Sequence, residues 1–306
     1  MGKYIITGAG GFIGHALCKF LLNKGYFVYG VDIQKNDNII DLLNSNSFKY
    51  IEAGFDDYKD LNSKICDDEI DAFFHFAWAG VFGDAFKNYG LQLNNTKAAC
   101  DALMAAISIG AKRFVFAATN NEIDAKRFAY MDYFKPRFTN VYATAKLSAE
   151  LICKTLAYNY GIEYSAGMIC MAYGEGNRSR MLANVLIDSL NKGISPKLVE
   201  GNNLYDMIYI QDIVQAFYAI ATRGKNMKTY YVGHRKLKTF KEWATIFRDV
   251  IAPSVELRFG EYKDDLNMDY SKIDLDALFN DTGFECSYPL LEGIVNTANW
   301  LKENSW

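Results

Sequence analysis

Short runs of consecutive apolar residues alternate along the chain with stretches in which apolar residues recur every three to four positions. The stretches predict amphipathic helices, as between residues 12 and 24, where one helical face collects Ile13, Ala16, Leu17, Phe20 and Leu21. The runs predict buried strands at 4–7, 26–32, 49–54, 71–77, 113–119 and 164–173. Near-continuous apolar strands separated by helices are typical of an α/β fold whose doubly wound parallel sheet is covered on both faces.

The alternation ends after Gly174. Later segments are more polar, and Pro196, Pro253 and Pro289 interrupt them. We therefore predict two units: a sheet domain at 1–173, to which 208–233 return, and a smaller α/β lobe at 174–306.

Composition excludes several classes of protein. The 306 residues carry a net charge of −3, and no basic excess indicates binding to nucleic acid or to an anionic membrane surface. The six cysteines form no CxxC pair, so we expect buried thiols and no metal site. No apolar stretch approaches the roughly 18 residues of a membrane span, and the N-terminus enters a strand without room for a signal peptide. We expect a cytoplasmic protein.

Three glycines, Gly8, Gly11 and Gly14, lie in the segment IITGAGGFIG between the first predicted strand and the first predicted helix. Glycines in such a turn allow a positive φ, close approach of the backbone to a pyrophosphate, and tight packing of helix on strand. The helix N-terminus at Phe12 and Ile13 would add free N–H groups and the positive end of the dipole. This pattern predicts a Rossmann-type dinucleotide site.

Asp32 ends the second predicted strand, 18 residues after Gly14. A carboxylate there accepts hydrogen bonds from both ribose hydroxyls of an adenosine and repels a 2′-phosphate. We therefore expect NAD. NADP is the less favoured cofactor, and it stays open because Lys35 lies nearby. Asp56 and Asp57 are further candidates near the adenine.

Tyr142 and Lys146 are four residues apart in VYATAKLSAE, so on a helix they share one face. A nearby ammonium favours the phenolate and would lower the pKa of Tyr142 from its usual value of about 10. Such a phenol can exchange a proton with an alcohol near neutral pH. An ordinary helix face remains the alternative for this pair alone.

The order of these motifs resembles the extended short-chain dehydrogenase/reductase superfamily, in particular its nucleotide-sugar epimerase/dehydratase branch. It runs from the glycine turn and the strand-end Asp through HFAW and a strand-end hydroxyl to the Tyr/Lys pair. The segment YDMIYIQDIVQAF is similar to the branch's RDFIYVDDLA, and residues 281–301 are similar to its C-terminal end.

The resemblance implies roles for individual residues. Tyr142 would be the general acid/base, Lys146 would hold the nicotinamide ribose, and Thr119 would hydrogen-bond the reacting oxygen. Phe76 and Ala77 would line the cofactor cleft. His75, in contrast, is expected to be a hydrogen-bonded interior histidine. The resemblance also implies a homodimer, formed by the helix after Asn94 and the helix that carries Tyr142.

Arg178 and Arg180 follow the sixth predicted strand directly and could bind a diphosphate bidentately, although a solvated loop pair is the alternative. Tyr205 and Lys263 stand where the branch has diphosphate-binding arginines, and Met171 and Gln92 replace two of its asparagines. The predicted substrate-binding residues are Thr119, Asn120, Arg178, Arg180, Tyr205 and Lys263. Asp206 and Arg258 are weaker candidates.

These departures favour a reductase of CDP- or dTDP-4-keto-6-deoxyhexoses, in which NAD(H) exchanges hydride at C4 while Tyr142 supplies the proton. An NAD-dependent nucleotide-sugar 4-epimerase or 4-dehydrogenase is the alternative enzyme. A non-catalytic dinucleotide-binding sensor or scaffold is the alternative of another class. A dehydratase is disfavoured because the segment TNNE lacks the branch's Asp-Glu pair after the strand-five hydroxyl.

Overall fold

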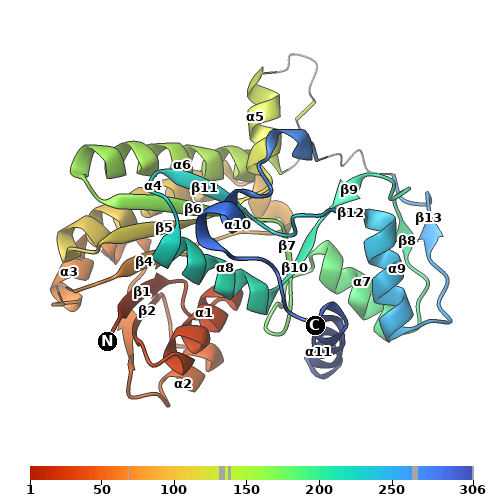
Figure 1. Cartoon of the computed structure of the whole chain (residues 1–306), viewed down its shortest axis with the longest axis horizontal. Coiled ribbons are helices and arrows are strands. Elements are labelled where there is room, and N and C mark those ends of the chain that lie inside the picture. Colours follow the sequence, from red (N-terminus) through yellow and green to blue (C-terminus); the bar gives the residue numbers. More distant parts are fainter. Residues whose placement is uncertain (68, 131–134, 137–138, 264–267, 305–306) are drawn as a thin grey trace.

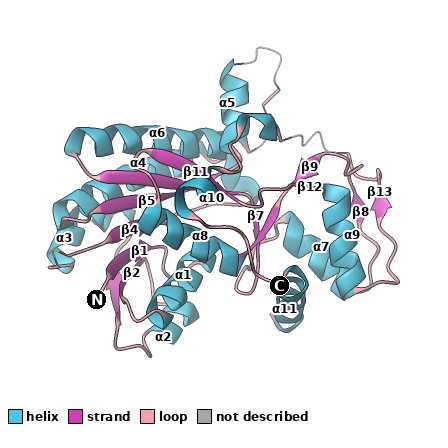
Figure 2. Ribbon diagram, in the orientation of Figure 1, coloured by secondary structure: helices cyan, strands magenta, loops and turns pink. Residues whose placement is uncertain are grey.

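Seven parallel strands form the sheet at the centre of the larger part of the molecule (Figures 1 and 2). The structure is a computed structural model, and it describes residues 1–67, 69–130, 135–136, 139–263 and 268–304. The strand order is β11-β6-β5-β4-β1-β2-β3. The bounds are β1 Lys3–Thr7, β2 Phe27–Asp32, β3 Phe48–Glu52, β4 Ala72–His75, β5 Arg113–Thr119, β6 Glu163–Ile169 and β11 Lys228–Val232. This confirms the predicted Rossmann-type sheet.

Helices cover both faces of the sheet. One face packs against α1 (Phe12–Asn23), α2 (Asp37–Leu42), α8 (Ile210–Arg223) and α10 (Ala277–Thr282). The other carries α3 (Leu61–Lys64), α4 (Tyr89–Ile109) and α6 (Asn140–Tyr160), with α5 (Glu122–Tyr130) projecting above it in Figure 1. Successive strand residues point to opposite faces of a sheet. Phe73 and Phe74 are both fully buried, which requires that helices cover both faces.

A smaller region lies beside the carboxyl ends of the strands, at the right of Figure 1. It contains α7 (Leu182–Asn191), α9 (Phe240–Ile251) and α11 (Leu290–Glu303). Three two-stranded sheets join it: β7 (Met171–Tyr173) with β10 (Met207–Tyr209), β9 (Leu204–Tyr205) with β12 (Lys238–Thr239), and β8 (Lys197–Leu198) with β13 (Arg258–Phe259). Short 3-10 turns lie at Phe55–Asp60, Gly83–Lys87 and Tyr270–Lys272.

The sequence predicts one sixth strand at 164–173, but the structure divides this segment into two strands, β6 and β7. The main strand ends at Ile169, and β7 leaves the sheet to pair with β10. The break follows from hydrogen bonding: Cys170 N–H still donates to Val232 O of β11, whereas Met171 N–H donates to Asp206 O. The chain therefore turns toward the smaller region at the strand's carboxyl end.

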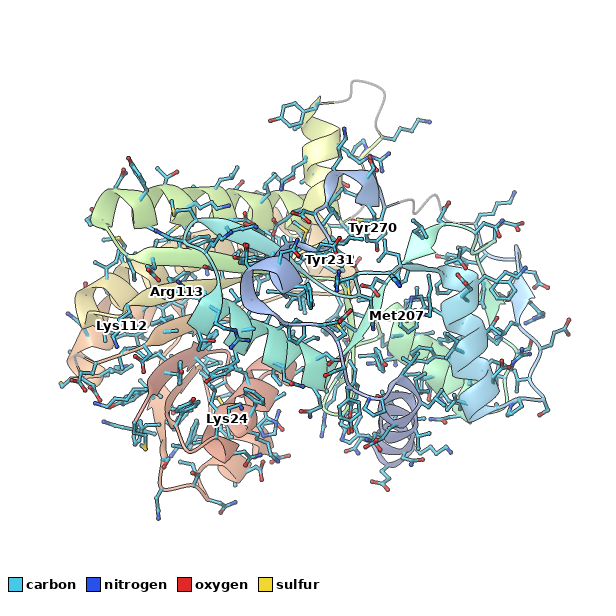
Figure 3. The ribbon with its side chains drawn as sticks, viewed as in Figure 1. Lys24, Lys112, Arg113, Met207, Tyr231 and Tyr270 are labelled. Atoms are coloured by element: carbon cyan, nitrogen blue, oxygen red, sulfur yellow. The ribbon has the colours of Figure 1, made fainter. Side chains whose placement is uncertain are left out.

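Buried polar and aromatic side chains tie the smaller region to the sheet. The Asp206 carboxylate accepts hydrogen bonds from the Tyr231 hydroxyl (2.9 Å) and the His234 backbone N–H (2.7 Å). Tyr231 packs edge-on against Tyr270, and both are labelled with Met207 in Figure 3. No helix in the described part of the chain has the length and apolarity needed to cross a membrane.

Candidate active site

A cavity of ≈ 1620 Å³ lies at the carboxyl ends of the strands and extends into the smaller region. It brings together most of the residues predicted for the site. Its lining includes Gly8, Gly11, Phe12, Ile13, Gly14, Phe76, Thr119, Asn120, Tyr142, Lys146, Arg178, Arg180 and Tyr205. Three other predicted residues, Asp32, Ala77 and Lys263, are not in that lining.

The glycine turn has the geometry that a dinucleotide needs. Gly8 adopts φ +72°, and a Cβ at Gly14 would overlap the Gly8 carbonyl oxygen, so the start of α1 packs directly on the turn. Gly11 caps α1 without any side-chain hydrogen bond. The first N–H groups of a helix have no intrahelical partners, and Phe12 and Ile13 face the cavity. This open helix N-terminus fits a pyrophosphate.

Asp32 stabilises the glycine turn through backbone hydrogen bonds. Its two carboxylate oxygens accept hydrogen bonds from the backbone N–H groups of Gly10 and Ile33, each at 2.8 Å. Ala77 packs against the same turn, since its backbone N would lie 2.9 Å from a Cβ on Gly8. Asp57 accepts from Gly54 N–H (2.8 Å) and does not line the cavity.

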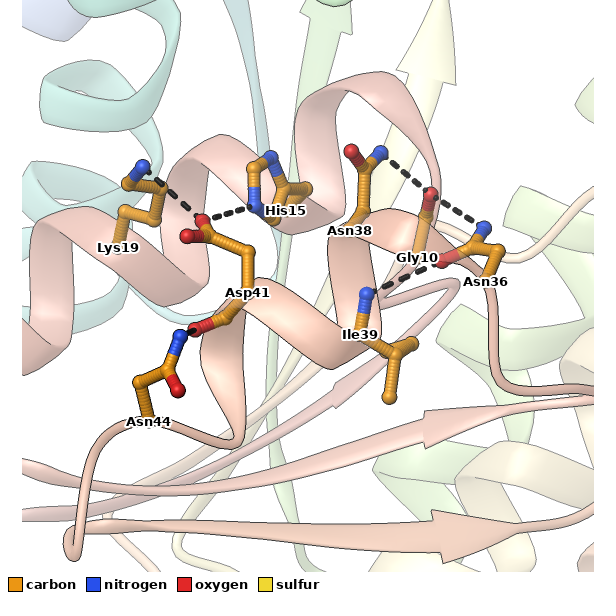
Figure 4. A network of polar contacts seen from close by, with 8 residues as sticks. All are labelled: Gly10, His15, Lys19, Asn36, Asn38, Ile39, Asp41 and Asn44. Atoms are coloured by element: carbon orange, nitrogen blue, oxygen red, sulfur yellow. Dashed lines mark hydrogen bonds and ion pairs between the residues drawn. The ribbon is translucent and has the colours of Figure 1, made fainter.

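Two asparagines that the sequence analysis missed grip the turn from α2 (Figure 4). The amides of Asn36 and Asn38 donate to Gly10 O at 3.1 and 2.9 Å. Asn36 also caps α2 by accepting from Ile39 N–H. An Asn ahead of a short helical pattern is a typical N-cap signal, so the cap was predictable, but its contact with Gly10 was not.

Thr119, Tyr142 and Lys146 meet where β5 ends and α6 begins. Thr119 and Tyr142 both line the cavity. Burial raises the pKa of Tyr142, and the neighbouring Thr119 side chain partly opposes the rise. The expectation that Lys146 lowers the pKa of Tyr142 does not match the structure, in which the contributions to that pKa come from burial, Thr119 and Glu122.

The Lys146 ammonium is directed elsewhere. It donates to Ala117 O at 2.8 Å and lies 3.8 Å from the centre of the Trp78 ring. Burial lowers the pKa of Lys146 to about 7. The pKa of the Lys146 ammonium is thus close to neutral pH.

Trp78 is a second feature that sequence reasoning missed. Its indole N–H donates to Gln92 Oε1 (2.9 Å), and Gln92 in turn donates to Gly80 O and Ala85 O. Trp78 and Phe86 pack edge-on against the Tyr142 ring. These aromatic side chains restrict the position of the phenol.

His75 is an interior residue, as expected. It is 1% exposed, and its Nδ1 hydrogen-bonds the Thr7 hydroxyl at 2.8 Å. Burial lowers the pKa of His75 to about 3.

The lobe end of the cavity carries cationic side chains. Arg178 and Arg180 line it, and the Arg178 guanidinium lies 6.0 Å from the centre of the Trp300 ring. Tyr262 lines the cavity where Lys263 was expected. Two weaker candidates have structural roles: Asp206 is buried in the network with Tyr231 and His234, and Arg258 donates to Ser195 O. No group of three potential metal ligands occurs among the described residues.

A glycine turn on a parallel sheet, with Thr, Tyr and Lys at one cavity, defines an enzyme of the extended short-chain dehydrogenase/reductase type. A model described as the NAD dependent epimerase/dehydratase family matches residues 4–233, and the chain belongs to that family. The family's dependence on NAD agrees with the cofactor that was predicted from Asp32.

Relatives and solved structures extend over the whole chain. The UDP-glucuronate 4-epimerase of Thermodesulfobacterium geofontis is 25% identical over 323 residues, covering 99% of this chain and 97% of the relative. A UDP-N-acetylglucosamine 4-epimerase from Methanobrevibacter ruminantium has the same fold (TM-score 0.81, 21% identity, 99% of each chain). So does the dTDP-glucose 4,6-dehydratase DesIV from Streptomyces venezuelae, solved with NAD bound (TM-score 0.79, 19% identity, 99% and 97%).

Proposed function

We propose that this protein is an NAD-dependent 4-epimerase of a nucleotide-linked hexose. The observation that carries the proposal is one cavity that joins an open helix N-terminus, the Thr119–Tyr142–Lys146 set and two arginines. The whole-length relatives include 4-epimerases, so the comparisons favour the alternative predicted from sequence over the 4-keto reductase, which they do not support.

The residues fit the cofactor as follows. The first turn of α1 would bind the pyrophosphate, Asp32 the adenosine ribose and Lys146 the nicotinamide ribose. When bound, NAD supplies a hydride acceptor and donor for C4 of the sugar. Tyr142 would take the proton of the 4-hydroxyl group and return it, while the Thr119 hydroxyl orients the reacting oxygen.

Arg178 and Arg180 would hold the substrate's diphosphate. Both line the cavity from the segment between β7 and α7, and guanidinium groups match phosphate oxygens in bidentate pairs. This leaves the sugar between the arginines and Tyr142.

A dehydratase is the second candidate, because DesIV shares the fold. Dehydration needs a further acid/base group that reaches the sugar. Glu122, the carboxyl residue closest after Thr119, is fully buried, accepts from Thr119 N–H (3.1 Å) and does not line the cavity. This placement favours the epimerase.

The test incubates the purified protein with UDP-glucuronate, UDP-glucose and UDP-N-acetylglucosamine separately and separates the C4 epimers by chromatography. We expect one of them to be epimerised without net NADH formation. Oxidation of NADH with a 4-keto-6-deoxyhexose nucleotide, and no epimer, would establish the reductase instead. NAD binding without any turnover would favour the sensor or scaffold.

We also propose a homodimer formed through α4 and α6. These helices pack side by side and expose Leu93 (63%), Leu151 (54%) and Ile152 (44%). Exposed apolar side chains on adjacent helices are typical of a subunit interface. Light scattering of the purified protein would show twice the chain mass; a monomer at micromolar concentration would contradict the proposal.

A further inference from the structure

Two buried carboxyl groups lie behind the Tyr142–Lys146 pair, and the proposed function uses neither. Glu122 is 0% exposed and Glu150 is 3% exposed. Glu150 follows Lys146 by one turn of α6, so Tyr142, Lys146 and Glu150 share a helix face. Glu122 begins α5 and reaches this face from the end of β5.

One oxygen of each carboxyl group has a clear donor. Glu122 Oε1 accepts from Thr119 N–H at 3.1 Å. Glu150 Oε1 accepts from the Thr229 hydroxyl at 2.6 Å and from the Lys154 ammonium at 3.3 Å. Lys154 is partly exposed, so this side of the pair faces the surface.

The other oxygen of each carboxyl group has no donor in the described part of the chain. Glu122 Oε2 and Glu150 Oε2 are buried, and no donor of the described residues reaches either one. Glu150 is nevertheless the carboxyl group that acts most strongly on Glu122. Since ionised carboxylates only accept hydrogen bonds, two such buried oxygens can satisfy one another only when one of them carries a proton.

The pKa shifts of the neighbouring groups agree with one proton on the pair of carboxyl groups. Burial and the neighbouring Glu150 raise the pKa of Glu122 well above its usual range, as expected for two carboxyl groups that share a dry site. The Glu122 charge acts in the opposite direction on Lys146: it raises the pKa of the ammonium, which burial lowers. One shared proton leaves one negative charge beside one buried cation.

The other titratable groups packed around the pair are mostly neutral. Burial keeps the pKa of His75 on β4 at about 3 and raises the pKa of Tyr164 on β6. The pKa of Cys153 on α6 is raised, chiefly by its hydrogen bond with Cys100, and the pKa of Cys100 on α4 is lowered by the same bond. Lys154 faces Glu150, which leaves Lys146 as the cation that acts on Glu122.

We propose that Glu122 and Glu150 share one proton, and that the single negative charge left on the pair is the counter-ion of the buried Lys146 ammonium. Both are positioning residues that act through Lys146. The inference rests on the proposed function only in giving that ammonium a cofactor ribose to hold.

The two glutamines should have opposite effects. In Glu122→Gln, the new amide donates to Glu150 and the charge moves away from Lys146 toward Lys154. The ammonium then loses its proton at a lower pH. In Glu150→Gln, the amide donates to Glu122, the full charge lies beside Lys146, and the proton is lost at a higher pH.

The first readout is the affinity for NAD against pH, followed by tryptophan fluorescence without substrate. We expect the wild-type affinity to fall above about pH 7, where the pKa of Lys146 lies. The midpoint should move down by about one pH unit in Glu122→Gln and up by about one unit in Glu150→Gln. Glu163→Gln, at an exposed carboxylate paired with Arg113, is the control and should not move it. Equal shifts, or none, would overturn the inference.

The second readout needs no NAD. Infrared spectra of the wild-type protein at neutral pH should contain a carboxylic-acid C=O band, which is absent from both glutamine variants because the remaining carboxyl group is ionised. A spectrum in which neither variant loses such a band would overturn the shared proton. Because this result is independent of turnover, failure of the epimerase proposal and failure of this inference are distinguishable.

Discussion

The two ends of the cavity are built from different kinds of groups. At the turn end, the groups that would meet a ligand are backbone N–H groups at Phe12 and Ile13, and neighbouring glycines allow only one close arrangement of strand and helix. At the lobe end, the corresponding groups are the long side chains of Arg178 and Arg180. The first end is determined by the backbone, so its chemistry follows directly from the sequence; the second depends on rotamers and on distant packing.

Tyr142 lies between the two ends, and its replacement should have the largest effect. Tyr142→Phe removes the proton-transferring hydroxyl but keeps the ring between Trp78 and Phe86. We expect kcat for epimerisation to fall about 1000-fold, with NAD affinity unchanged. Stopped assays and NAD titration would measure both, with the exposed Tyr130→Phe as control. A variant that keeps its kcat would remove Tyr142 from the chemistry.

The turn end is tested by a pair of glycines. Gly14→Ala places a Cβ on the Gly8 carbonyl oxygen, so the start of α1 must move away from the turn. NAD affinity should drop about 100-fold, and the free energy of unfolding should fall by about 3 kcal/mol. Gly25→Ala, at φ +79° with no atom within 4 Å, should cost only about 1 kcal/mol and leave NAD affinity unchanged. Denaturant unfolding and NAD titration would measure these effects; equal losses of affinity in both variants would show that the turn tolerates a side chain.

The lobe end should respond through the substrate alone. Arg178→Ala or Arg180→Ala should raise KM for the sugar nucleotide about 20-fold, the effect of one charged hydrogen-bonded pair, without changing NAD affinity. Lys263→Ala tests the residue predicted from sequence that lies outside the cavity lining, and KM should change by less than about twofold. Steady-state kinetics would measure KM in all three variants. A larger rise in KM for Lys263→Ala than for the arginine variants would indicate that the diphosphate binds near residue 263.

The same contrast explains what could be predicted from the sequence. The strands, the glycine turn and the spacing of Tyr142 and Lys146 depend on local patterns, and the structure places them together. The break after Ile169 and the contact of Trp78 with Lys146 depend on residues far apart in the chain. The direction of the Tyr142 pKa was wrong because spacing shows which groups are neighbours but not how dry their surroundings are.

The smallest expected effect is that of Lys146 on the stability of the folded protein. The pKa of Lys146 is about 7 in the folded protein and returns to the usual 10.5 on unfolding, so between these values the unfolded chain binds more protons. Stability therefore rises with pH across this window, and the cost of burying Lys146 is greatest at and below pH 7. Lys146→Met should raise the melting temperature by about 3 °C at pH 7, with the gain shrinking toward pH 10, while NAD affinity falls. Lys192→Met, at an exposed ammonium that pairs with Asp188, is the control and should show no such change. A gain at Lys146 that does not change with pH would mean that the pKa of Lys146 is the same in the folded and the unfolded protein, so that the ammonium keeps its proton throughout this window despite its burial.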